Sequence, residues 1–107
     1  MDTPTVLTLN EALGLVRRYK QVIAPRFDHE IEVRMFGSYA KGSANPWSDI
    51  DVAVIVPEIK DDQWLDASVQ LGMDADKVSL LIEPVLIERG EDSMLYKEVM
   101  RTGIAAR

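Results

Sequence analysis

Residues 36–56 of the chain read FGSYAKGSANPWSDIDVAVIV. The stretch begins with a Gly-Ser turn at Gly37 and Ser38, and an Asp-Ile-Asp sequence follows after ten intervening residues. The second aspartate leads into a run of β-branched and small apolar residues, which is typical of a buried strand. Because side chains alternate along a strand, Asp49 and Asp51 share one face and the valines share the other. The sequence therefore predicts a strand over 49–56 with two carboxylates at its start.

Alternating helical and strand patterns surround this stretch. Apolar residues recur at helical spacing after Thr8, a candidate N-cap, until Pro25 ends the pattern. An alternating pattern over 29–36 predicts a half-buried strand, and residues 38–42 fit a single helical turn. The remaining segments predict a helix over 61–73, a strand over 77–87 with Pro84 at an edge or bulge, and a helix over 94–102 between Ser93 and Gly103.

Together these elements predict an α/β (α+β) fold, in which a small mixed β-sheet is flanked by helices. We find no internal repeat, low-complexity tract or linker, and a length of 107 residues suits one domain. We therefore expect a single domain over 1–107. Hydrophobic residues make up 47% of the chain, which is enough for a modest core.

Composition excludes several classes of protein. With no cysteine, the chain forms no disulfide, thiolate nucleophile or Cys-based zinc site, and a reducing cytoplasm is compatible. No signal peptide is recognisable, and no apolar run approaches the roughly 20 residues that span a bilayer, so we expect a cytoplasmic protein. A net charge of −6 argues against non-specific nucleic-acid binding. It still allows a nucleotide substrate, because a metal ion can supply positive charge locally.

The two aspartates at the start of the predicted strand indicate a magnesium site. Asp49 and Asp51 repel each other and raise one another's pKa unless a cation lies between them. Mg²⁺ prefers oxygen ligands and is usually held by one or two carboxylates plus substrate phosphates. The pair therefore favours a metal site that also binds a phosphate.

The Gly-Ser turn offers a place for that phosphate. Gly37 allows a ligand to approach the backbone closely, and Ser38 offers a hydroxyl and an N–H at a predicted helix start. A phosphate between this turn and metals on the aspartates is the arrangement used for phosphoryl or nucleotidyl transfer. Two metals about 3.5–4 Å apart would activate the attacking oxygen and stabilise the leaving pyrophosphate.

A two-metal site normally includes a third carboxylate on a neighbouring strand. Glu83, in the predicted strand 77–87, is our candidate, as a metal ligand or as the base that deprotonates the acceptor hydroxyl. The alternative interpretation makes Glu83 an edge residue that faces water.

The Gly37-Ser38 turn, the ten-residue spacing and the Asp-Ile-Asp sequence, set between two strands, resemble the signature of the DNA polymerase β-like nucleotidyltransferase superfamily. The sequence GSYAKGSANPWSDIDV is most similar to its minimal nucleotidyltransferase (MNT) group. The resemblance implies a mixed sheet backed by helices. It also implies magnesium-dependent transfer of a nucleoside monophosphate from a nucleoside triphosphate, for which ATP is the usual donor.

The resemblance also implies roles for individual residues. Gly37 and Ser38 would bind the triphosphate, and the two aspartates would bind the metals. Lys41 occupies a position where the family often has arginine, and it would either contact a phosphate or remain in solvent. The family's third carboxylate corresponds here either to Glu83 or to Ser79, and if Ser79 is the equivalent, activity is weak or lost.

Many minimal members of the family pair with a small helical HEPN protein as the antitoxin of a ribonuclease toxin. Some resemble adenylyltransferases that add AMP to a tyrosine of that partner. By this resemblance we expect the chain to AMPylate a HEPN-type toxin within a toxin–antitoxin system. Two alternatives remain open: a catalytically inactive module that neutralises the toxin by binding alone, and a nucleotide sensor that binds ATP without turnover.

Three further expectations concern residues to which the motif assigns no role. We expect Trp47 to pack over the core rather than stack on a base, and we place Asp74 and Asp76 in a solvated loop. Four apolar residues of the last predicted helix are assigned mostly to the core, and any exposed part of them is a candidate docking site for a partner: Met94, Leu95, Val99 and Met100.

Overall fold

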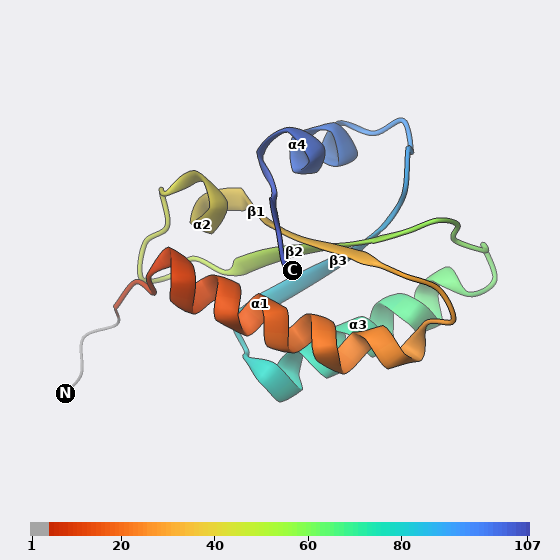
Figure 1. Ribbon diagram of the computed structural model, residues 1–107, viewed down its shortest axis with the longest axis horizontal. Helices are drawn as coiled ribbons and strands as arrows, with labels where there is room; N and C mark the ends of the chain where they lie inside the picture. Colours follow the sequence, from red (N-terminus) through yellow and green to blue (C-terminus); the bar gives the residue numbers. More distant parts are fainter. Residues whose placement is uncertain (1–4) are drawn as a thin grey trace.

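The structure is a computed structural model that describes residues 5–107. A four-stranded sheet runs through its centre in the order β3-β2-β1-β4 (Figure 1). Strand β1 (Glu32–Phe36) is antiparallel to both β2 (Ile50–Val56) and β4 (Ile104–Ala105), whereas β2 is parallel to β3 (Ile82–Glu88). The predicted small mixed sheet is therefore confirmed.

Helices cover both faces of the sheet. Helices α1 (Leu9–Ile23) and α3 (Trp64–Val78) lie on one face, and α4 (Met94–Thr102) lies on the other (Figure 1). The five-residue helix α2 (Gly37–Lys41) follows directly on β1, and a 3-10 turn, η1 (Ala24–Arg26), extends α1. None of the helices within residues 5–107 is both long and apolar enough to cross a lipid bilayer.

Local sequence signals explain where the two predicted terminal helices begin and end. Helix α1 starts after a capping box, in which the Glu11 N–H donates to the Thr8 hydroxyl and the Glu11 carboxylate accepts from the Thr8 N–H. Helix α4 starts after Ser93, whose hydroxyl accepts from the Tyr96 N–H, and it ends before Gly103. Both caps were predicted from the sequence, and both are confirmed.

Strand β2 is buried on both faces of the sheet. Ile50 and the valines that follow it at alternate positions pack with α1 and α3 in the larger core cluster. On the other face, Ala53 and Ile55 pack with Val99 of α4 in a smaller cluster. The predicted valine face is confirmed, and α4 adds a second buried face that the alternation pattern did not predict.

Several predicted boundaries were wrong. Residues 77 and 78 end helix α3, and β3 begins only at Ile82, so the predicted strand 77–87 started five residues too early. The strand predicted over 29–36 begins at Glu32, and the two-residue strand β4 was not predicted. Pro84 lies on β3, which is an edge strand of the sheet, and this matches the predicted edge position.

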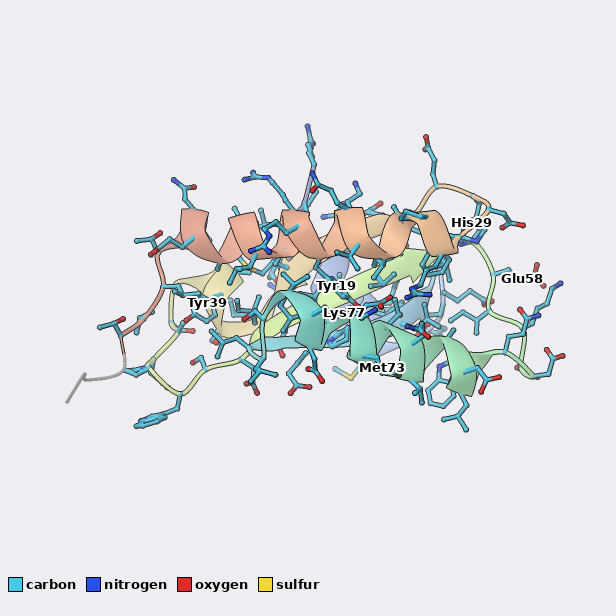
Figure 2. All side chains as sticks on the ribbon, turned by 90° about the horizontal axis from the view of Figure 1, so that it is seen from below. Tyr19, His29, Tyr39, Glu58, Met73 and Lys77 are labelled. Atoms are coloured by element: carbon cyan, nitrogen blue, oxygen red, sulfur yellow. The ribbon has the colours of Figure 1, made fainter. Side chains whose placement is uncertain are left out.

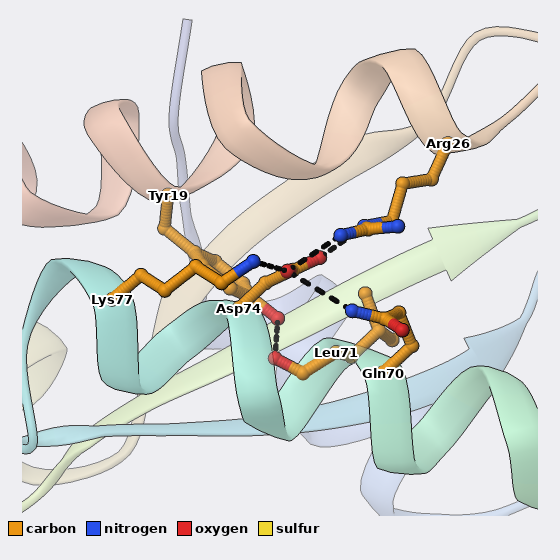
Figure 3. Close-up of polar contacts among 6 residues, drawn as sticks. All are labelled: Tyr19, Arg26, Gln70, Leu71, Asp74 and Lys77. Carbon is orange, nitrogen blue, oxygen red and sulfur yellow. Dashed lines mark hydrogen bonds and ion pairs between the residues drawn. The ribbon is translucent and has the colours of Figure 1, made fainter.

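Asp74 was predicted to lie in a solvated loop, and this prediction was wrong. It is a fully buried residue of α3. Its carboxylate accepts hydrogen bonds from Arg26, Lys77 and Gln70 (Figure 3). Nearby, the Tyr19 hydroxyl donates to the Leu71 carbonyl at 2.8 Å. This polar network joins η1 and α1 to α3, and the expectation failed because Arg26, the partner on the other element, lies 48 residues away in the chain.

The apolar residues singled out in the sequence are less buried than expected. Val99 is buried and Met100 is partly buried, but Met94 is 87% exposed and Leu95 is 39% exposed. Trp47 does not pack over the core either, because 80% of its surface is exposed. The prediction that α4 is mostly core was therefore only half right.

Candidate active site

Gly37 is the point where the Gly-Ser turn and the aspartate strand touch. It has a φ of +74°, in the left-handed region that favours glycine. A Cβ at this position would lie 3.0 Å from the Asp51 carboxyl carbon and still closer to Asp51 Oδ2. Phe36, the residue before it, is the register partner of Asp51 in the antiparallel β1–β2 pair. Only a residue without a side chain therefore allows the Asp51 carboxylate to lie against this turn.

Helix α2 holds Ser38 directly beside that contact. Its second residue is Ser38, and Gly42 ends the helix in the left-handed conformation, at a φ of +76°. Tyr39 anchors the helix, because its ring is buried and its hydroxyl accepts from the Leu7 N–H at 3.4 Å (Figure 2). The Gly-Ser turn is thus fixed to the core on one side and open on the Ser38 side.

The two aspartates differ in their surroundings. Asp49 is exposed and precedes the first residue of β2, whereas Asp51 is partly buried within the strand. The loop before them is held by short-range bonds: Ser48 Oγ accepts from the Asn45 N–H, and Asn45 Oδ1 accepts from the Trp47 N–H. This ordered turn keeps the Trp47 ring exposed two residues before Asp49.

Glu83 lies next to Asp51 on the neighbouring strand. The two residues are register partners in the parallel β2–β3 pair, so their side chains leave the same face of the sheet. Ser79 is not part of this strand. It follows the last residue of α3, and its hydroxyl accepts from the Leu81 N–H. Of the two candidates for the third position, only Glu83 is beside Asp51.

Electrostatics at this point of the sheet are unfavourable for a bare carboxylate. The pKa of Asp51 is raised above its ordinary value by burial, and the negative charges of Asp49 and Glu83 raise it further. Within residues 5–107, no three acidic, histidine or cysteine side chains lie close enough together to share one metal ion. The three carboxylates therefore influence one another through their charge but are not already gathered around a single point.

Lys41 forms an ion pair with α4, and its side chain stays half exposed. Its ammonium group forms an ion pair with Glu98 Oε1 at 2.9 Å, and Glu98 also pairs with Arg101. Hydrogen bonds from Lys41 and Arg101 lower the pKa of Glu98 below its ordinary value. The pairing of Glu98 with Lys41 was not predicted from the sequence, because nothing in the spacing of α4 indicates that Glu98 faces α2.

The comparison with protein families identifies the chain. The nucleotidyltransferase domain family matches residues 16–100, which include the Gly-Ser turn, the three carboxylates and strands β1, β2 and β3. The chain belongs to this family. Its membership confirms the superfamily that the motif resembles. No curated protein is similar enough in sequence to count as a match.

Solved structures show that this nucleotidyltransferase domain shares its fold with known proteins. A candidate nucleotidyltransferase from Sulfolobus solfataricus is 20% identical, with a TM-score of 0.68 over 97% of this chain and 90% of that one. A chain from the complex of a tri-AMPylated Shewanella oneidensis HEPN toxin with its MNT antitoxin is 16% identical, with a TM-score of 0.57 over 94% and 72%. A chain from a toxin–antitoxin structure with AMP-PNP is 21% identical, with a TM-score of 0.51 over 94% of this chain and 73% of that one.

Proposed function

We propose that this nucleotidyltransferase domain moves AMP from ATP onto a partner protein in a magnesium-dependent reaction. One observation carries the proposal: Asp51 lies against Gly37 on one side and beside Glu83 on the other, and Asp49 and Glu83 both raise its pKa. Family membership supports the reaction class. A cluster of acidic groups that disfavour each other's charge has a clear chemical use when a cation is bound among them.

The donor set fits magnesium. Asp49, Asp51 and Glu83 offer only carboxylate oxygens, which are the ligands that Mg²⁺ prefers. When bound, the ion would neutralise phosphate charge and make the acceptor hydroxyl easier to deprotonate. Glu83 acts either as a third ligand or as the base that accepts the hydroxyl proton.

The remaining residues position the nucleotide. Gly37 leaves room for a phosphate beside its backbone, and Ser38 offers its hydroxyl and N–H to the triphosphate. Lys41 lies one helical turn further on α2, and it can turn from Glu98 to a phosphate oxygen. In the transfer, the acceptor oxygen forms a bond to the α-phosphorus, the bond to the bridging oxygen breaks, and pyrophosphate leaves.

We propose that the acceptor is a HEPN-type toxin and that the chain is its antitoxin. The similar structures support this choice, since one contains a tri-AMPylated HEPN toxin in complex with an MNT antitoxin and another contains AMP-PNP. The competing function is a module that neutralises the toxin by binding without transfer. The separation of the three carboxylates is the observation that favours this alternative.

Label transfer from ATP distinguishes the two functions. The chain is incubated with magnesium, with a HEPN-type protein as the acceptor, and with ATP labelled at either the α- or the γ-phosphate. We expect only the α label to reach the partner. Asp51→Asn should lower the transfer rate at least about a thousandfold, which is roughly 4 kcal/mol of activation free energy.

The matched control is Asp28→Asn, which removes a carboxylate from a fully exposed position and should transfer at the wild-type rate. Transfer of the γ label would refute nucleotidyl transfer. A stable complex without any transfer would establish the binding-only antitoxin.

A further inference from the structure

Helix α3 presents large apolar side chains on both of its sides. Leu71 and Ala75 are buried against the core. On the opposite side, Leu65, Val69 and Met73 are 63%, 54% and 57% exposed. They are four residues apart, so they form one stripe along the helix. Figure 2 shows Met73 on the edge of α3 that lies away from α1. A continuous stripe of this kind differs from the scattered apolar residues that any surface carries.

Acidic residues accompany this stripe. Asp66 and Asp76 are exposed and, by helical spacing, fall on the same side of α3, and Asp62 is exposed in the turn just before the helix. None of the three forms an ion pair with another described residue. The nearest basic residue of the helix, Lys77, is paired with the buried Asp74. We call these three aspartates and the stripe the α3 outer face.

This combination selects one kind of occupant. Three apolar anchors at four-residue spacing fit an amphipathic helix, as in helix-in-groove recognition. The unpaired aspartates beside them favour a partner helix that carries Lys or Arg next to its apolar side chains. A second copy of this chain is disfavoured, because a two-fold contact would place the same aspartates against each other.

We propose that the α3 outer face docks a basic amphipathic helix of a different protein chain. The inference rests on the proposed function, in which the partner is a HEPN-type protein, and it adds the surface through which that partner is held. The face belongs to a helix on the side of the sheet opposite α4, whereas Asp51 and Glu83 share the α4 side. Substitutions on the α3 outer face can therefore change docking without altering the residues proposed to carry out transfer.

Binding of a HEPN-type protein, measured by titration calorimetry, tests the apolar stripe. The triple variant Leu65→Ala, Val69→Ala, Met73→Ala keeps good helix formers and removes the anchors. We expect its affinity to fall at least about tenfold. A matched control removes the same three residue types from exposed positions elsewhere, as Leu9→Ala, Val22→Ala, Met94→Ala, and should bind like the wild type.

A second variant set tests the charges. Asp62→Asn, Asp66→Asn and Asp76→Asn together should weaken binding several-fold at low salt and flatten its dependence on ionic strength. The control set neutralises exposed carboxylates elsewhere, as Asp28→Asn, Glu30→Gln, Glu58→Gln. Thermal unfolding of each variant checks that it is folded.

The outcomes separate this inference from the proposed function. Binding that survives in Asp51→Asn but is lost in the stripe variant supports the docking surface. Wild-type affinity in both α3 sets would overturn it while leaving the transfer function intact. A dimer of the chain in sedimentation that the stripe variant dissociates would replace the partner by a second copy. If the wild-type chain does not bind the HEPN-type protein at all, the proposed function fails, and the inference fails with it.

Discussion

Two clusters, each built around an aspartate, lie on opposite faces of the same sheet. The surroundings shift the pKa values of the two aspartates in opposite directions. Burial alone would raise the pKa of Asp74, but hydrogen bonds from Arg26, Lys77 and Gln70 hold it below its ordinary value. Burial raises the pKa of Asp51, and its charged neighbours, Asp49 and Glu83, raise it further. The carboxylate of the first cluster is neutralised by residues of the chain, whereas the carboxylates of the second disfavour one another's charge.

The difference teaches how to distinguish a structural carboxylate from a functional one. Asp74 satisfies its charge with residues of η1 and α3, so its energetic contribution is realised as soon as the chain folds. Burial and the charges of Asp49 and Glu83 disfavour the ionised form of Asp51. Its charge becomes favourable only when something positive binds, which is the behaviour expected of a ligand site.

After loss of Asp51 itself, Gly37→Ala should give the largest effect, because it disturbs the Asp51 cluster directly. The added Cβ meets the Asp51 carboxylate at a φ that disfavours a side chain, so we expect transfer to fall about a hundredfold or more and stability to fall by about 1–3 kcal/mol. Transfer assays and urea unfolding measure the two effects.

The control for that variant is Gly90→Ala. Gly90 has a similar φ of +79° but has no neighbour within 4 Å of an added Cβ. It should lose stability through strain alone and keep full transfer activity. Equal losses of activity in both variants would show that the Gly37–Asp51 contact has no special role.

Arg26→Met tests the neutralised cluster. The change leaves the fully buried Asp74 carboxylate without its two-nitrogen partner. We expect the free energy of unfolding to fall, by less than for a fully buried ion pair because Lys77 and Gln70 still donate to Asp74, without a change in transfer rate. Arg18→Met, on the exposed side of α1, should cost less than about 0.5 kcal/mol. A loss of transfer activity in Arg26→Met would mean that the two clusters are coupled through the sheet.

Glu83→Gln should have a smaller effect than loss of Asp51. We expect about a 10- to 100-fold fall in transfer rate and a higher magnesium requirement, because the variant keeps the shape but loses one negative charge. Magnesium titrations of activity measure both. Ser79→Ala, which removes the other candidate, should leave the magnesium requirement unchanged. A higher magnesium requirement in Ser79→Ala, with an unchanged one in Glu83→Gln, would assign the third position to Ser79.

The dependence of stability on pH should show both clusters with opposite signs. Because the folded pKa of Asp51 is raised, its ionisation destabilises the fold, and the protein gains stability as pH falls from neutral to mildly acidic. Because the folded pKa of Asp74 is lowered, its contribution is present above about pH 4 and disappears as pH falls further. Unfolding curves from pH 7 to 3 should therefore pass through a maximum, and Asp51→Asn should abolish the initial rise.

The sequence by itself determined the elements that depend on neighbours along the chain. The spacing between Gly37-Ser38 and the aspartates, the alternation in β2, and the caps of α1 and α4 are local signals, and the structure reproduces each of them. They were sufficient to predict the mixed sheet and the family. The roles of the site residues remain predictions that the variants above will test.

Only the tertiary structure decided which distant residues meet. The register of β2 with β3 places Glu83 beside Asp51, the packing of α4 gives Lys41 its partner Glu98, and the approach of η1 to α3 buries Asp74. No local pattern encodes these contacts, because each joins residues separated by at least 32 positions in the chain. Burial and charge neutralisation depend on such long-range contacts, so the same residue type is a solvated side chain, a structural ion pair or a site residue according to where the fold places it.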